Sequence, residues 1–117
     1  MRTTDPQGAF TKPSTALVND LVRRIVEGVH PLRIILFGSA ARGEMGPNSD
    51  LDVLVIMPDG THRRKTSQLL HERMWGLGFA KDIIVATAGD VRRHGDDPGL
   101  IYSSALREGR ELYHAGA

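Results

Sequence analysis

The spacing of apolar residues along the chain predicts three helices. Apolar residues recur every three or four positions from Leu17 to Val29, which is the spacing of one helix face. Ser14 or Thr15 can cap the start of this helix, and Pro31 stops it. The other two helices are predicted over residues 62–77 and 98–113, the last with room for a short terminal strand.

Three runs rich in β-branched residues predict strands, over residues 32–38, 50–58 and 78–87. The stretch between the first two runs is rich in Gly, Pro, Asn and Ser and is predicted to be a loop. Asp59 and Gly60 predict a turn after the second strand. The order of these elements predicts an α/β fold in one domain, in which a small mixed sheet packs against helices.

The same pattern predicts which side chains face the core. The second helix is expected to bury Leu69, Leu70, Met74 and Leu77. Trp75 and Tyr102 could face a partner, but a position in the core or half-buried beside it is the expected one.

Composition adds limits to this picture. The chain has 117 residues, a formal net charge of +1 and no cysteine. A length of this order fits one domain, which we expect over residues 14–117 after a flexible segment at 1–13. The balanced charge does not indicate direct nucleic-acid binding. The lack of cysteine and of any apolar run near the ~20 residues of a membrane span fits a cytoplasmic protein.

Two aspartates in the second strand are the first candidates for chemistry. Side chains alternate along a strand, so Asp50 and Asp52 point to the same side, with their Cα atoms roughly 7 Å apart. Their charges repel unless a cation lies between them. Oxygen ligands suit Mg²⁺ or Mn²⁺ better than zinc. In an isolated D-x-D, however, the first aspartate more often ends a turn and the second faces solvent. The preceding loop therefore decides whether a metal site is the better interpretation.

That loop follows a strand and begins with Gly38 and Ser39. Glycine lets the backbone approach a ligand, and serine offers a hydroxyl and an N–H to a phosphate oxygen. The loop is neither a Walker A motif nor a dinucleotide-binding fingerprint. By itself it also fits a plain turn between a strand and a helix.

Together, Gly38-Ser39, ten further residues and Asp50-x-Asp52 form the pattern G-S-x₁₀-D-x-D. This pattern resembles the polymerase-β-like nucleotidyltransferase superfamily, and in particular its smallest members, the minimal nucleotidyltransferase (MNT) domains. The resemblance covers roughly residues 14–113. It implies the nucleotidyltransferase fold and the use of an NTP, with ATP as the default donor, and of two Mg²⁺ ions, with Mn²⁺ as an alternative.

The resemblance also implies a third acid on a following strand, and Asp82 is the carboxylate inside the predicted third strand. Asp50 and Asp52 would then hold the metal that carries the triphosphate, and Asp52 and Asp82 the metal beside the acceptor hydroxyl. Asp82 would also accept the proton of that hydroxyl. Gly38 and Ser39 would hold the triphosphate. An alternative for Asp82 is an ion pair at the edge of the strand.

Two groups of cations have no settled role. Arg42 lies on the phosphate-binding loop and would contact phosphate, or else pair with Glu44. His62-Arg63-Arg64-Lys65 begins a predicted helix, where cations oppose the helix dipole. Such a cluster fits phosphate, RNA or an acidic partner, and fits a solvated charged face better still.

Stand-alone MNT proteins resemble the antitoxins of MNT/HEPN toxin–antitoxin pairs. The resemblance implies that the chain transfers AMP from ATP to a hydroxyl, most simply a tyrosine, of a HEPN ribonuclease toxin. One alternative is a catalytically silent module that neutralises the toxin by binding it. Another is a small-molecule nucleotidyltransferase similar to those that modify aminoglycosides, although the expected length leaves no room for their second domain.

Overall fold

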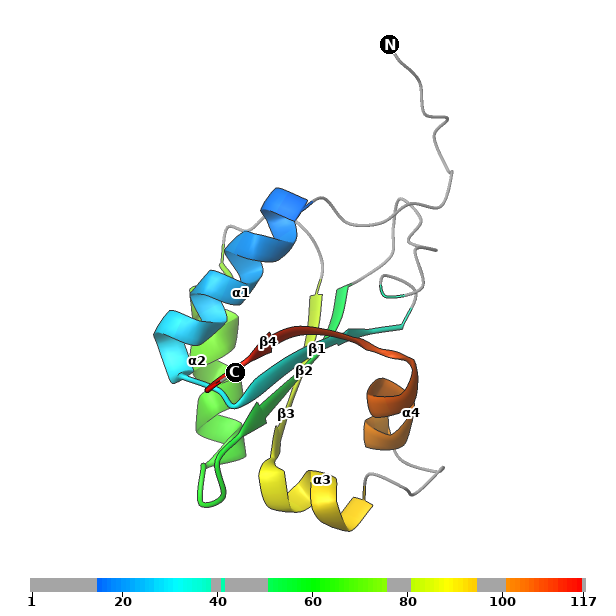
Figure 1. The fold of residues 1–117 in the computed structure, drawn as a ribbon. Helices are drawn as coiled ribbons and strands as arrows, with labels where there is room; N and C mark the ends of the chain where they lie inside the picture. Colours follow the sequence, from blue (N-terminus) through cyan, green and yellow to red (C-terminus); the bar gives the residue numbers. More distant parts are fainter. Residues whose placement is uncertain (1–14, 39–40, 42–50, 76–80, 95–100, 117) are drawn as a thin grey trace.

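The structure is a computed structural model that describes residues 15–38, 41, 51–75, 81–94 and 101–116 (Figure 1). Four helices and four strands occur in these residues. They are α1 (Thr15–Val29), β1 (Arg33–Phe37), β2 (Leu51–Met57), α2 (Arg63–Arg73), β3 (Lys81–Thr87), α3 (Ala88–His94), α4 (Ile101–Glu108) and β4 (Arg110–His114). None of the helices described is both long and apolar enough to cross a membrane.

The four strands form one mixed sheet in the order β3-β2-β1-β4. β1 runs antiparallel to β2 and to β4, whereas β2 and β3 are parallel. The two central strands are almost continuously apolar because both of their faces are covered. The predicted small mixed sheet is therefore confirmed.

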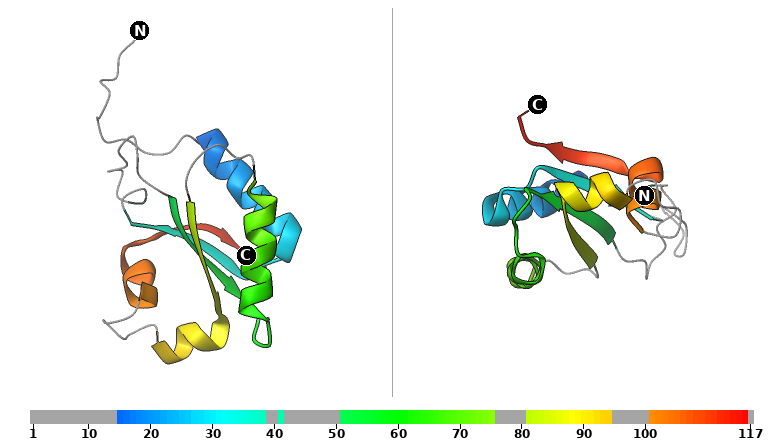
Figure 2. Two further views of the ribbon diagram at one scale, coloured as in Figure 1. Left: turned by 180° about the vertical axis from the view of Figure 1, so that it is seen from behind. Right: turned by 90° about the horizontal axis from the view of Figure 1, so that it is seen from below.

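Helices cover both faces of the sheet (Figures 1 and 2). α1 and α2 pack on one face, where alternate residues of β2 such as Val53 and Val55 point. The intervening residues Leu54 and Ile56 point to the other face, where they pack with residues of α3 and α4. Each face thus has its own apolar cluster, and the α/β architecture predicted from the sequence is confirmed.

The predicted helix over residues 98–113 is wrong at its C-terminal end, where residues 110–113 belong to a strand. α4 ends at Glu108, and residues 110–114 form the edge strand β4, which is the short terminal strand that the sequence allowed. Gly109 makes the change of direction: its N–H donates to the carbonyl of Ala105 at 2.9 Å, and a Cβ at this position would lie 2.9 Å from the Leu36 carbonyl oxygen. Any larger residue would collide with β1 there.

The helix α3 was not among the predicted elements. Its start is fixed by a reciprocal pair of hydrogen bonds: the N–H of Asp90 donates to the Thr87 hydroxyl at 3.1 Å, and the N–H of Thr87 donates to the Asp90 carboxylate at 3.0 Å. This is a capping box, with aspartate in place of the usual glutamate. The sequence signal was Thr87-Ala88-Gly89-Asp90.

Two expectations about the core are also wrong. Leu70 and Met74 are buried as expected, but Leu69 is 42% exposed and Trp75 is 87% exposed. α2 is a surface helix with a polar outer side, and Leu69 lies on that side. Trp75 lies two residues beyond the end of α2 and is not packed in the core. Leu77 and the side chain of Tyr102 lie outside the described part of the chain.

Candidate active site at one end of the sheet

The strand directions bring three of the predicted site residues to one end of the sheet. β1 ends at Phe37 beside Asp52, near the start of β2, because these two strands are antiparallel. β3 runs parallel to β2 and begins at the same end, so Asp82 is the register partner of Asp52. Gly38 follows β1 directly. This is the upper end of the sheet in Figure 1.

The two aspartates are direct neighbours across β2 and β3. Paired strands are about 4.8 Å apart, and side chains at paired positions leave the sheet on the same face. Asp52 is partly buried and is the one residue of β2 that is not fully buried, while Asp82 is exposed. The sheet therefore presents two carboxylates side by side at its margin.

This juxtaposition fits a divalent cation. Two like charges at this backbone spacing repel by about 1–3 kcal/mol before screening by salt. A cation bound between them would turn that repulsion into attraction. Carboxylate oxygens are the ligands that Mg²⁺ and Mn²⁺ prefer, so Asp52 and Asp82 suit either ion.

Gly38 leaves room for the carboxylate of Asp52. Its φ is +74°, in the left-handed region that favours glycine. A Cβ at this position would collide with Oδ2 of Asp52. The absence of a side chain at Gly38 therefore lets the end of β1 lie directly against the carboxylate.

The remaining predicted site residues, Ser39, Arg42 and Asp50, lie outside the described residues. Within the described residues, no group of three or more His, Asp or Glu side chains could hold a metal ion. Asp52 and Asp82 are accordingly the two predicted ligands whose positions the structure gives. Asp82 forms no ion pair with the side chains that the structure describes. The side chain of Lys81, the first candidate for such a pair, is outside them, so a paired acid at the strand edge stays an alternative.

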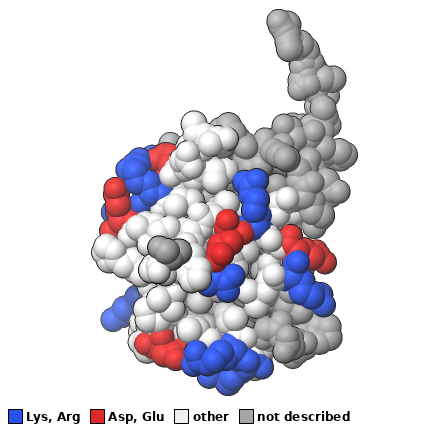
Figure 3. Space-filling model, in the orientation of Figure 1, with Lys and Arg blue, Asp and Glu red and all other residues white. Residues whose placement is uncertain are grey.

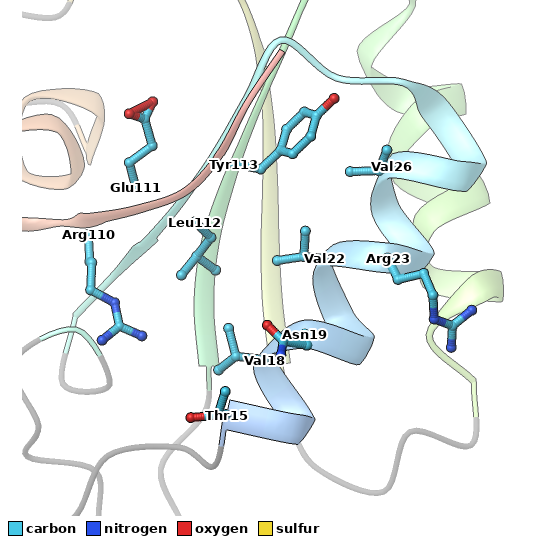
Figure 4. A pocket seen from close by; sticks show the side chains of 10 residues that line it. All are labelled: Thr15, Val18, Asn19, Val22, Arg23, Val26, Arg110, Glu111, Leu112 and Tyr113. Atoms are coloured by element: carbon cyan, nitrogen blue, oxygen red, sulfur yellow. The ribbon is translucent and has the colours of Figure 1, made fainter. Parts of the chain in front are cut away.

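A groove of about 780 Å³ lies elsewhere, between α1 and β4 (Figure 4). Val18, Val22 and Val26 of α1 form one wall, and Leu112 and Tyr113 of β4 form the other. A bulge in the pairing of β4 with β1 lets Leu112 and Tyr113 both pack against the α1 side. This groove opens on the face of the sheet opposite Asp52 and Asp82, so it is not part of the candidate active site.

At the other end of the sheet, two further carboxylates are neutralised by partners. Asp59 accepts hydrogen bonds from Arg92 at 2.9 Å and from the N–H of Gly89 at 2.6 Å. Both bonds hold the pKa of the Asp59 carboxyl below its ordinary value, and the bond from Arg92 has the larger effect. Asp59 thereby ties the turn after β2 to α3.

Asp90 is buried and has still more partners. The N–H of Thr87 lowers the pKa of its carboxyl most, and the pKa stays low although burial opposes the shift. Arg63 and Arg93 each bond to this carboxylate at 3.0 Å and lower its pKa further. The sequence analysis missed this network, for which the capping box around Asp90 was the available signal.

Comparison with known proteins places the chain in a family. Its residues 18–111 match the family described as the nucleotidyltransferase domain. The chain belongs to this family. The matched region runs from α1 into β4 and contains Gly38, Asp52 and Asp82.

Two solved structures share the fold of this nucleotidyltransferase domain. A Sulfolobus solfataricus protein described as a candidate nucleotidyltransferase is 18% identical, with a TM-score of 0.59 over 86% of this chain and 79% of that one. The second is a mutant of the toxin–antitoxin pair MntA–HpeT, in which two aspartates two positions apart are replaced by glutamate. Its matching chain is 16% identical, with a TM-score of 0.62 over 85% of this chain and 74% of that one. No curated protein matches significantly. The predicted nucleotidyltransferase fold is confirmed.

Proposed function

We propose that this nucleotidyltransferase domain uses Mg²⁺ to transfer AMP from ATP to a hydroxyl of a partner protein. The observation that carries the proposal is the pairing of Asp52 with Asp82 at the end of the sheet, beside Gly38. Carboxylates placed in this way suit a cation that binds phosphate. Membership of the nucleotidyltransferase family supports the reaction class, and the choice of ATP follows from the resemblance to MNT domains.

The residues fall into two groups in this proposal, one for the metal and one for the triphosphate. Asp50, Asp52 and Asp82 would hold Mg²⁺, which when bound supplies positive charge to the phosphate oxygens. The backbone at Gly38 and Ser39, with Arg42, would hold the triphosphate. The acceptor oxygen forms a bond to the α-phosphorus, the bond from that phosphorus to the bridging oxygen breaks, and pyrophosphate leaves. Asp82, the exposed acid of the pair, would accept the proton of the acceptor hydroxyl.

We further propose that the acceptor is a tyrosine of a HEPN-type ribonuclease toxin, with the chain acting as antitoxin. The fold shared with one member of the MntA–HpeT pair supports this choice. The two aspartates replaced in that pair have the same spacing as Asp50 and Asp52 in this chain. A phenol suits the chemistry because its pKa of about 10 makes it easier to deprotonate than an aliphatic alcohol.

The test co-expresses the chain with the protein encoded by the neighbouring reading frame and then adds ATP and Mg²⁺. Intact-protein mass spectrometry should show AMP added to the partner, and peptide mapping should place it on a tyrosine. Asp82→Asn should abolish the addition. Asp59→Asn is the matched control, because it removes a carboxylate at the opposite end of the sheet, and it should leave the addition intact.

Three results would contradict parts of the proposal. Partner neutralisation without added mass, in both the parent and Asp82→Asn, would support a silent binding module. Addition of AMP that persists in Asp82→Asn would remove the role of Asp82. Transfer of AMP only to a small molecule would retain the enzyme and overturn the protein acceptor.

A further inference from the structure

Cationic side chains gather at the end of the sheet opposite the candidate active site. Arg63, Arg64 and Lys65 come from the first turn of α2, and Arg92 and Arg93 come from α3. We call this surface the basic end. Figure 3 shows cationic side chains gathered along this lower edge of the molecule. With Asp59 and Asp90, the two acids that bond to these arginines, the described residues of the basic end have a formal charge of +3, whereas the whole chain has +1.

The two acids hold the arginines in place, the buried Asp90 from beneath and the exposed Asp59 at the surface. Asp90 bonds to Arg63 and to Arg93 at 3.0 Å, and Asp59 bonds to Arg92 at 2.9 Å. The three arginine side chains are nevertheless 56%, 64% and 69% exposed. A guanidinium has five N–H donors, so each arginine keeps donors that face solvent. Guanidinium groups fixed in this way suit the planar, bidentate recognition of phosphate.

A hollow of about 620 Å³ lies beside these arginines, over the start of α2. Its lining consists of polar and charged residues, namely Thr61, His62, Arg63, Arg64, Lys65 and Gln68. Arg64 and Lys65 are exposed, and neither forms an ion pair with the described part of the chain. The first turn of α2 contains no acid that would offset these charges or suit the helix dipole. An external anion would supply that missing negative charge.

The lining favours a nucleic acid over an acidic protein. Protein interfaces have an apolar core, with aromatic residues enriched in it. The lining of this hollow contains no large apolar side chain. Protein–nucleic acid interfaces, by contrast, are polar and strongly positive. The lining contains no Phe, Tyr or Trp, and His62 has its one aromatic ring. It therefore offers bases little to stack on, and we expect the phosphate backbone to be the main contact.

We propose that the basic end binds the phosphate backbone of a nucleic-acid strand, without regard to its sequence. This second binding site lies apart from the candidate active site and does not depend on the proposed transfer reaction. Contacts confined to phosphates do not read bases or the sugar. Single-stranded RNA and DNA of one length should therefore bind with affinities within a few-fold of each other.

The test is fluorescence anisotropy with labelled RNA and DNA strands of about 20 nucleotides, over a series of salt concentrations. The parent chain should bind with a Kd of about 10⁻⁴–10⁻⁶ M near physiological salt. The logarithm of its association constant should fall linearly with the logarithm of the salt concentration. The double variant Arg64→Glu/Lys65→Glu should weaken binding at least tenfold and flatten that slope. Its melting temperature should match or exceed that of the parent, because both side chains are exposed, make no ion pair within the described residues, and are replaced by acids that suit the helix dipole.

The matched control is Arg107→Glu/Arg110→Glu, which changes the net charge by the same amount. Both residues are exposed, and Arg110 pairs with Leu36, at the other end of the sheet. This control should change the affinity less than threefold. Absence of salt-dependent binding in the parent would overturn the proposal, as would an equal loss in the control. A loss of partner-protein binding in Arg64→Glu/Lys65→Glu, with no nucleic-acid binding in the parent, would assign the surface to an acidic protein instead.

Discussion

The two ends of the sheet treat aspartate in opposite ways. At the lower end, Asp90 is buried and bonds to two arginines and to a backbone N–H. At the upper end, the residue placed directly beside Asp52 is another aspartate, Asp82. One end joins its carboxylates to arginines, whereas the other places two carboxylates side by side.

The difference separates acids that stabilise the fold from acids that prepare a site. A carboxylate that has arginine and N–H partners lowers the free energy of the folded state. Two carboxylates side by side raise it, unless a cation joins them. We therefore expect substitutions at the lower end to change stability and substitutions at the upper end to change chemistry.

The largest expected effect is on the reaction. Asp52→Asn should lower the rate of nucleotidyl transfer at least about 100-fold, because it removes a proposed metal ligand. The melting temperature should change little, since asparagine has the size and shape of aspartate and Asp52 lies near the start of β2. Rates come from pyrophosphate release with ATP and Mg²⁺, and stability from thermal unfolding. A variant that loses stability but keeps its rate would reverse the roles of the two ends.

At the lower end, Asp90→Ala should cost about 2 kcal/mol of unfolding free energy. It removes the cap of α3 and the ion pairs of Arg63 and Arg93. Urea titration of the variant measures this loss, and transfer activity at a temperature where the variant is folded should match the parent. Arg64→Ala serves as the control, with an effect within about 0.5 kcal/mol. A loss of activity larger than the unfolded fraction explains would show that the two ends are coupled.

Two glycines with positive φ give a sharper comparison. Gly38 and Gly60 have φ values of +74° and +91°, and an alanine at either should cost about 1 kcal/mol of stability. A Cβ at Gly38 meets the Asp52 carboxylate, whereas a Cβ at Gly60 meets nothing within 4 Å. Gly38→Ala should therefore lower transfer activity and Gly60→Ala should not, at similar melting temperatures. Equal transfer activities of Gly38→Ala and Gly60→Ala would mean that the close approach of Gly38 to Asp52 does not contribute to the reaction.

The smallest expected effect is on how the unfolding free energy falls at acid pH. The pKa values of Asp59 and Asp90 are lowered in the folded state, so their contribution is complete above the ordinary value of 3.8. It is lost as pH falls through the lower, folded-state pKa values. Unfolding free energy measured between about pH 5 and pH 2 should fall less steeply in Asp90→Asn than in the parent. An unchanged slope would show that Asp90 does not contribute to acid unfolding.

The sequence predicted the sheet and α1 well because their patterns are unambiguous. β1 and β2 are apolar apart from Arg33 and Asp52, and α1 repeats its apolar residues over four turns. The sequence analysis missed α3 because seven residues are too few to show a helical periodicity, although the capping box at Asp90 was present. β4 was assigned to a helix because a five-residue stretch with two apolar positions fits either period, and only its pairing with β1 decides.

Part of the candidate site also depends on tertiary structure. Asp82 lies 30 positions from Asp52 along the chain, and the register of β2 with β3 makes them neighbours. The resemblance to nucleotidyltransferases, and not periodicity, selected Asp82 as the third acid. The exposure of Trp75 likewise could not be predicted from its type, since aromatic residues usually favour burial.

The most direct test of the account is the binding of Mn²⁺, a spectroscopic substitute for Mg²⁺, in the presence of ATP. Electron paramagnetic resonance measures free Mn²⁺ during titration of the parent, Asp52→Asn and Asp59→Asn. The account predicts that Asp52→Asn weakens ATP-dependent Mn²⁺ binding at least tenfold, while Asp59→Asn binds as the parent does. Equal binding by the parent and Asp52→Asn, or a loss confined to Asp59→Asn, would contradict the assignment of the metal to the Asp52–Asp82 end of the sheet.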